Sequence, residues 1–263
     1  MPLIRHEVQG LEGLLREALA IAETIPESSF LWFRGLSRSS HKLCPSIMRD
    51  GKTSDIVFER EKRLLTRFRQ RSLAYWPAGY PQNDWDHLFA MQHFGMPTRL
   101  LDWTENLFVA AHFALNPSQG SLEDNDEHPP TIWCLDPVEW NRSTPVLSEF
   151  GDSIQVLTTS DDEADSYRPD TTKRRNKTPV ALYGTHNSTR IVAQRGTFMV
   201  WGNDTRALED FADELPAKVW KLEIMGQREK LRKSLSRIGF AETMVFPELP
   251  SLARELTLQE GWR

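Results

Sequence analysis

The sequence has few of the residues that build cross-linked or metal-centred folds. It contains two cysteines in 263 residues, Cys44 and Cys134, and each stands alone. Neither has a second cysteine at the spacing of a zinc site or a redox motif, so we expect two reduced, buried thiols that act as small hydrophobic side chains. His93 and His112 lack a third ligand at a recognisable spacing, so a metal-dependent hydrolase is not favoured and no metal ligands are expected.

Long hydrophobic runs are also missing. No stretch approaches the roughly 18 uninterrupted apolar residues of a membrane helix, and the beginning, MPLIRHEVQGLEGLL, has no long apolar segment of a secretion signal. We expect a cytoplasmic protein with no membrane contact. The net charge of -5 gives no bulk attraction for nucleic acid. Basic clusters occur at 59–71 and 173–175, but acidic residues dilute them, and a solvated face is the simpler interpretation.

Familiar catalytic signatures are absent as well. The chain has no GxxxxGK[ST] loop, no GxGxxG turn, no HExxH helix and no GxSxG elbow. Nothing therefore assigns a P-loop nucleotidase, a dinucleotide fold of the Rossmann type, a zinc protease or a serine hydrolase. Any function has to be inferred from polar residues at the ends of secondary-structure elements.

The patterns that are present predict an α+β fold with a mixed, mainly antiparallel central sheet flanked by helices. Residues 1–27 are expected to be an N-terminal helical extension, and residues 28–263 one domain with a mobile insert at about 151–177. Helices are predicted over 10–25, 55–72, 84–94, from Thr104 into the alanine-rich segment that follows, and twice near the end, with a short strand between the last two. Strands are predicted at 28–35, 98–103, 131–135, 178–184, 189–201 and 217–224. Most of the nine tryptophans are expected in the core.

The segment QHFGMPTRLLDWTENLFVAAHFAL, residues 92–115, carries unusual polarity beside apolar residues. Asn83 or Asp84 can cap the helix before it, and helical spacing places Gln92 and His93 on the same side as the core residues. A Gly-Met-Pro break follows. Asp102 then lies near the end of a strand, and Thr104 can cap the next helix. We expect a tight corner between strand and helix.

Several cationic or amide side chains fall on predicted core strands. They are Arg34, Arg99, Arg190 and Gln194, and they are costly there unless they meet each other or an anionic ligand. Arg34 directly precedes Gly35, where the backbone is accessible, and a guanidinium suits a phosphate or a carboxylate. Pairing of Arg34 with Asp102 as a purely structural contact is the open alternative. Gly196 inside its predicted strand suggests a bulge or a close backbone approach.

Four blocks in order, FLWFRGLSRSSHKLCPSIMR, QHFGMPTRLLDWTENLFVAAHFAL, TRIVAQRGTF and FPELPSLAREL, resemble the FRG domain family, named for the motif at 33–35. The resemblance covers about residues 28 to 256, and PTRLLDWT is its most specific part. Because the family is met mostly in bacterial and phage-related proteins, it implies a cytoplasmic role in conflict with phages, such as phage defence.

The order of motifs is also similar to that of arginine-class ADP-ribosyltransferases. This resemblance implies NAD as a co-substrate, with no tightly bound cofactor. Asp102 and Gln194 would be the catalytic residues, and the cofactor-binding residues would be Arg34, Gly35, His93, Thr98, Arg99, Thr104 and Arg190. The family's catalytic glutamate should fall near Gly196, but no carboxylate lies between 189 and 202. A non-catalytic module that binds or senses a nucleotide or small anion therefore stays open, as do a protein or nucleic-acid acceptor and the oligomeric state.

Overall fold

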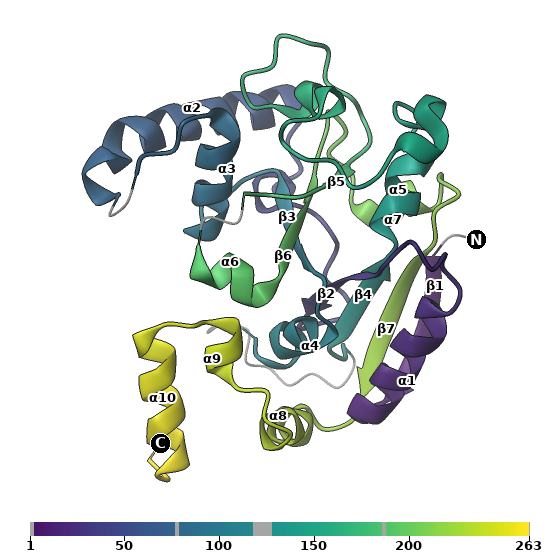
Figure 1. The fold of residues 1–263 in the computed structure, drawn as a ribbon, viewed down its shortest axis with the longest axis vertical. Coiled ribbons are helices and arrows are strands. Elements are labelled where there is room, and N and C mark those ends of the chain that lie inside the picture. Colours follow the sequence, from purple (N-terminus) through teal and green to yellow (C-terminus); the bar gives the residue numbers. More distant parts are fainter. Residues whose placement is uncertain (1–2, 77–78, 118–127, 186–187, 263) are drawn as a thin grey trace.

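The computed structural model describes residues 3–76, 79–117, 128–185 and 188–262. Within these residues the chain forms one seven-stranded sheet with the strand order β1-β7-β4-β2-β3-β6-β5 (Figure 1). Among the strands of the described residues, β1 and β7 pair in parallel, and every other neighbouring pair is antiparallel. The predicted α+β class with a mixed, mainly antiparallel sheet is confirmed. The strands are β1 Leu3–Gln9, β2 Trp32–Leu36, β3 Leu100–Thr104, β4 Thr131–Leu135, β5 Val180–Leu182, β6 Gly196–Val200 and β7 Val219–Met225.

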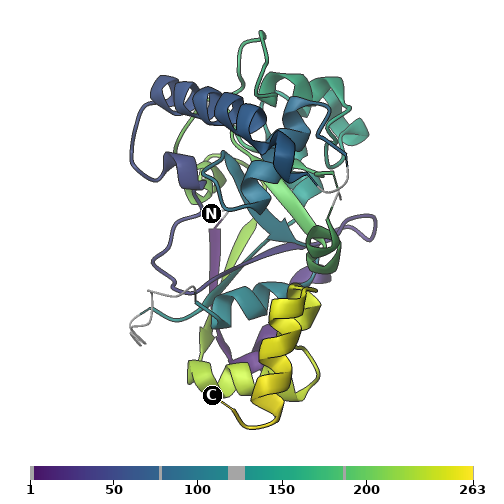
Figure 2. The same cartoon turned by 90° about the vertical axis from the view of Figure 1, so that its left-hand side faces the viewer.

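Helices cover both faces of this sheet (Figures 1 and 2). One face packs against α1 and α8, and α4 crosses β2 on this face. Helix α3 and the 146–167 segment cover the β5 end of the same face. The other face packs against α5 and α7. The α-helices are α1 Gly10–Ala22, α2 Ser54–Ser72, α3 Asp84–His93, α4 Leu107–Leu115, α5 Pro137–Ser143, α6 Thr189–Gln194, α7 Leu208–Ala212, α8 Arg228–Arg237, α9 Glu242–Val245 and α10 Leu249–Gln259. Short 3-10 helices span Ser46–Met48, Leu73–Tyr75, Ser148–Ser153 and Asp162–Tyr167.

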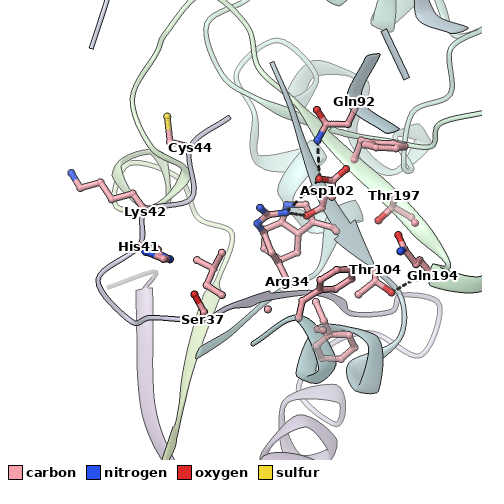
Figure 3. A pocket seen from close by; sticks show the side chains of 18 of the residues that line it. Arg34, Ser37, His41, Lys42, Cys44, Gln92, Asp102, Thr104, Gln194 and Thr197 are labelled. Atoms are coloured by element: carbon pink, nitrogen blue, oxygen red, sulfur yellow. Dashed lines mark hydrogen bonds and ion pairs between the residues drawn. The ribbon is translucent and has the colours of Figure 1, made fainter. Parts of the chain in front are cut away.

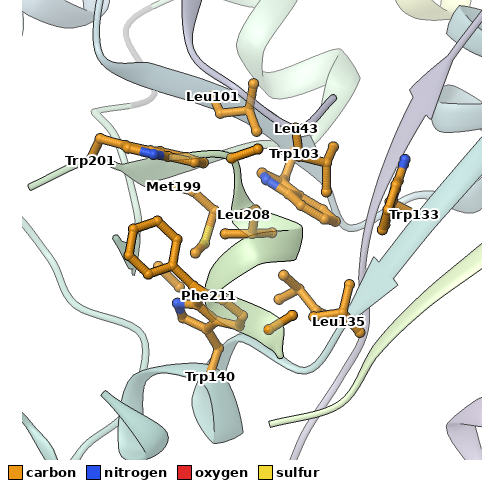
Figure 4. Close-up of a cluster of buried hydrophobic side chains, with 14 of the residues drawn as sticks. Leu43, Leu101, Trp103, Trp133, Leu135, Trp140, Met199, Trp201, Leu208 and Phe211 are labelled. Carbon is orange, nitrogen blue, oxygen red and sulfur yellow. The ribbon is translucent and has the colours of Figure 1, made fainter. Parts of the chain in front are cut away.

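Indole rings fill the core beneath α5 and α7 (Figure 4). Trp103, Trp133, Trp140 and Trp201 are buried there. Two of these indoles have their N–H groups satisfied by backbone carbonyls, because Trp140 donates to Pro179 at 2.8 Å and Trp201 donates to Arg206 at 2.9 Å. Most tryptophans are core residues, as predicted. Cys44 and Cys134 are both free and buried, which confirms their prediction.

The strand predicted over 189–201 was wrong in its first half. Residues Thr189–Gln194 form the helix α6, and β6 begins only at Gly196. The Ser188 side chain caps the helix by accepting from the Ile191 N–H at 3.2 Å, and Arg195 ends it with a left-handed φ of 45°. Arg190 and Gln194 therefore lie on a helix. Gly196 is the first residue of its strand, and a Cβ there would meet Ile191 at an ordinary 3.5 Å.

Two further elements differ from the sequence expectation. Residues Leu3–Gln9, expected within a helical extension, form an edge strand that pairs with β7 along its whole length, so this part of the chain completes the sheet. The short strand predicted between the last two helices is instead α9. The 151–177 segment packs against the sheet, where Leu157, Ala164 and Tyr167 are buried in the cluster that also contains strand β5.

The corner between β3 and α4 is as tight as expected, but its cap differs. Asn83 caps α3, as one of the two candidates, by accepting from the Asp86 N–H at 2.9 Å. The cap of α4 is Asn106, which accepts from the Phe108 N–H at 2.9 Å, whereas Thr104 accepts one step earlier, from the Asn106 N–H at 3.0 Å. Thr104 therefore shapes the turn and does not cap the helix.

Candidate functional site

The central feature is a split between two neighbouring strands. β2 and β3 pair at one position only, Phe33 opposite Thr104, and beyond it β2 follows β4 while β3 follows β6. Helix α4 presses on β2 next to this split: a Cβ on Gly35 would lie 1.8 Å from the carbonyl oxygen of Ala110. Only glycine allows that approach, so Gly35 lets α4 pack directly on the strand that carries Arg34.

Arg34 lies at the split. Its Nη1 donates to the backbone carbonyl of Asp102, on the edge of β3 that β2 has left unpaired, and the same nitrogen is 3.9 Å from the Asp102 carboxylate. Its Nε is buried and has no hydrogen-bond partner in the described part of the chain. Burial lowers the pKa of this guanidinium, and the charge of Asp102 opposes that shift. The pairing with Asp102, left open as an alternative, is therefore present, mainly through the backbone.

A cavity of about 840 Å³ opens around the split (Figure 3). On one side of Arg34 lie Asp102, Gln92, Thr104 and Gln194, and on the other side lie Ser37, His41, Lys42 and Cys44. Seven of the nine residues expected to form the site line this cavity: Arg34, Gly35, His93, Asp102, Thr104, Arg190 and Gln194. The split thus brings residues that are far apart in the sequence to one place.

Asp102 is held by a short hydrogen-bonded chain. The Gln92 amide donates to its Oδ2 at 2.8 Å, and the Thr98 hydroxyl in turn donates to the Gln92 carbonyl oxygen. Thr98 is fully buried and does not reach the cavity, so it orients Gln92 rather than a ligand. The Asp102 side chain keeps 56% of its surface exposed, which leaves its carboxylate accessible from the cavity.

Arg99 also lies outside the cavity, and its role differs from the one expected. Its side chain has 0% exposure, its Nε is 3.2 Å from the Glu61 carboxylate of α2, and its Nη2 donates to the Tyr167 carbonyl at 2.6 Å. The guanidinium also lies over the Phe58 ring at 5.2 Å. Arg99 is thus a buried structural cation that joins α2 to the 151–177 segment. In the alternation of TRLLDW, Arg99 falls on the face of the strand opposite to Asp102.

The helix α6 forms one wall and leans on α9. The Gln194 side-chain amide donates to the Val245 carbonyl at 3.1 Å, and the Gln194 backbone carbonyl accepts from the Thr104 hydroxyl at 2.6 Å. Arg190 lies over the Phe246 ring at 4.6 Å. The pKa of His93 is lowered, first by burial and then by the positive charge of Arg190. His93 is therefore biased toward its neutral form on this wall.

The structure adds residues that the sequence did not single out. Thr197 lines the cavity with its hydroxyl buried and without a partner among the described residues. In the sequence, Thr197 is the threonine between the glycine and the phenylalanine of QRGTF. The basic residues His41, Lys42, Arg49 and Arg206 come from segments without periodic pattern, so no sequence signal placed them at the split.

The position near Gly196 receives a carboxylate from the turn that follows β3. Glu105 donates its N–H to the Arg195 carbonyl at 3.2 Å, and its side chain is 3.3 Å from the Arg195 guanidinium. Tyr183 donates its hydroxyl to the same carboxylate at 3.2 Å. This carboxylate is already committed to an ion pair and is not among the residues lining the cavity, so it does not stand in for the glutamate expected near Gly196.

The fold and the site define a mixed α+β domain with a cationic cavity at a strand split. The family model of the FRG domain matches residues 29–122, a range that includes Arg34, Gly35, Gln92 and Asp102, so the chain contains an FRG domain. No curated protein and no solved structure matches the chain. Within the described residues, no group of three or more His, Cys, Asp or Glu side chains could hold a metal ion. None of the described helices is long and apolar enough to cross a membrane.

Proposed function

We propose that the cavity at the split binds a nucleotide-like anion. The observation that carries this proposal is a pair of buried polar atoms, the Nε of Arg34 and the hydroxyl of Thr197, which have no partner in the described part of the chain. Buried polar groups nearly always have partners, and an unpaired one is costly. Both residues line the cavity, but these two atoms have almost no accessible surface, so their side chains would have to turn toward a ligand for its acceptor atoms to satisfy them.

The charges around the cavity support an anion. Besides Arg34, the lining includes Lys42, Arg49 and Arg190, against the carboxylates of Asp102 and Asp210. The pKa of His41, on the Lys42 side, is lowered by burial and then by neighbouring arginines, as expected where cations crowd together. The wall also contains aromatic rings, which suits a ligand with a phosphate and a flat ring.

NAD is the specific ligand that the resemblance to ADP-ribosyltransferases suggests, and Asp102 supports a reaction with it. In such a reaction the bond between ribose C1′ and the nicotinamide nitrogen breaks, and the bonding electrons leave with nicotinamide. The ribose then carries oxocarbenium-like positive charge until a nucleophile bonds to C1′ and loses its proton. A carboxylate next to C1′ stabilises that charge. Asp102 is accessible and held by Gln92, so it is the candidate for this role.

A binding or sensing module without chemistry is the second candidate. Two observations favour it: Asp102 already accepts from Gln92 and lies 3.9 Å from Arg34, and no carboxylate occurs between residues 189 and 202. Under this alternative the same cavity holds the anion, and NAD or a related nucleotide is bound intact.

Thermal melting with NAD, ADP-ribose, ATP and inorganic phosphate tests the binding. A ligand at 100 times its Kd stabilises the folded state by about 2.7 kcal/mol, which raises Tm by roughly 5–10 °C for a chain of this size. We expect Arg34→Gln and Thr197→Val to lose most of the shift relative to their own ligand-free Tm. Arg60→Gln is the control, because Arg60 of α2 pairs with Asp50 and is not part of the lining. Equal shifts in all four proteins would exclude this cavity as the site.

Release of nicotinamide from NAD, followed by chromatography, separates the two candidates. Catalysis predicts release by the wild type, its loss in Asp102→Asn, and a retained melting shift in that variant. Binding of NAD with no release by the wild type would leave the sensing module. The phage-defence role implied by the family is tested separately, by comparing phage plaque counts on bacteria that express the wild type or Arg34→Gln.

A further inference from the structure

The second half of α2 presents a row of arginines to solvent. Residues 62–76 contain no Asp or Glu, and Arg63, Arg67 and Arg71 follow one another at four-residue spacing on the exposed side of the helix. Lys62 lies beside them. In the part of the chain that the structure describes, none of these four has an acidic partner, whereas Arg69 of the same helix pairs with Asp84. We call Arg63, Arg67 and Arg71 the basic row.

The basic row is unfavourable for the isolated helix. Like charges four residues apart repel each other, and the favourable effect of the helix C-terminus reaches only Arg71 in the last turn. The row places positive charges about every 6 Å over about 12 Å of helix. It lies on the outside of the molecule, on the long helix at the upper edge of Figure 2. An anionic polymer is the partner that would relieve this repulsion.

Exposed rings continue the surface beyond the end of α2. Tyr75 is 82% exposed and Phe94 is 66% exposed. Trp76 follows Tyr75 in the sequence, and its ring centroid lies 6.4 Å from that of Phe94. The Phe94 ring lies 4.9 Å from the ring of His93, which lines the cavity. The surface therefore runs from the basic row to the rim of the cavity.

We propose that the basic row together with Tyr75 and Phe94 binds single-stranded nucleic acid. The arginines contact successive phosphates, and the exposed rings stack on bases. A single strand fits better than a duplex, because only unpaired bases offer their flat faces for stacking. The net charge of -5 means that attraction comes from this surface and not from the whole chain. This binding surface ends at the rim of the cavity, and none of its own residues lines the cavity, so the proposal does not depend on what the cavity holds.

Fluorescence anisotropy with a labelled oligothymidylate of about 16 nucleotides tests the proposal. At about 50 mM salt we expect Arg63→Ala, Arg67→Ala and Arg71→Ala together to weaken binding at least tenfold. The slope of log affinity against log salt should become less steep by about 2, at roughly 0.7 for each lost phosphate contact. Tyr75→Ala should weaken binding roughly tenfold without changing that slope.

Two controls keep the result specific. Replacing Lys230, Lys233 and Arg237 of α8 by alanine removes the same charge from another exposed helix, and Thr197→Val alters the cavity alone. Both should bind the oligonucleotide like the wild type. The proposal is overturned if the wild type does not bind, if the α8 variant loses as much affinity as the α2 variant, or if a duplex of equal length binds as well as the single strand.

Discussion

Removing the carboxylate of Glu61 should strongly destabilise the protein. Arg99 and Glu61 have side-chain exposures of 0% and 3%, and Arg99 Nε lies 3.2 Å from the Glu61 carboxylate. Glu61→Ala leaves the guanidinium charge of Arg99 in the interior with one donor on the Tyr167 carbonyl and no counter-charge. Breaking a buried pair in this way costs about 3–5 kcal/mol. For a chain of this length that corresponds to a fall in Tm of roughly 6–20 °C.

The matched variant replaces both partners, Glu61→Leu with Arg99→Met. Apolar side chains of similar volume remove both charges together, so this double variant should recover most of the lost stability. Urea unfolding followed by tryptophan fluorescence measures both variants, and the midpoint should move while the slope stays constant. A cost below about 1 kcal/mol for Glu61→Ala, or a double variant no more stable than the single one, would refute the assignment of Arg99 as a structural cation. The double variant should also keep any melting shift caused by NAD.

Two other expectations follow from local geometry. Gly35→Ala should prevent native packing, because its Cβ would lie 1.8 Å from the Ala110 carbonyl oxygen. Gly196→Ala should fold, because the nearest neighbour of its Cβ would lie at 3.5 Å. Denaturation curves of both variants check this, and a stable Gly35→Ala variant would contradict it. Burial lowers the pKa of His112 below its ordinary 6.5, against the opposing charge of Glu242. Its contribution to stability is therefore complete above pH 6.5 and declines as pH falls from 6.5 to the lowered pKa. Urea unfolding across this range should show less loss for His112→Gln than for the wild type, and equal losses would count against the shift.

Elements with a strong period were predictable from the sequence, and their partners in space were not. The β4 strand at 131–135 and the helices α1, α2 and α3 lie where alternation or helical spacing placed them. The 189–201 segment failed because its apolar residues suit a strand equally well, while the deciding feature is the cap from Ser188 and the left-handed turn at Arg195. β1 was missed because its polar edge residues obscure the alternation of a strand in the sequence. The strand becomes recognisable only through its pairing with β7.

The candidate site shows the same limit. Arg34 and Asp102 could be singled out because charged groups next to apolar strands are costly. The same reasoning also selected Arg99, since a sequence cannot show whether a buried cation meets a ligand or a carboxylate on another helix. Glu61, its partner, appears in the sequence as one of three acidic residues in a helix that is mainly basic. The basic residues on the Lys42 side of the cavity lie in loops, where no helical or strand periodicity indicates which way a side chain points.

The split between β2 and β3 explains why the motif joins an arginine to a glycine. Gly35 lets α4 pack against β2, and β2 diverges from β3 after a single paired position. That divergence leaves the Asp102 carbonyl without a ladder partner, and Arg34 supplies one from its side chain. The same guanidinium keeps its Nε buried and unpaired among the described residues, while the residue lines the cavity. Arg34 therefore supplies a hydrogen bond to the open edge of β3 and also lines the cavity. A loss of ligand binding in Arg34→Gln is informative only when Thr197→Val, which leaves the sheet intact, loses it too.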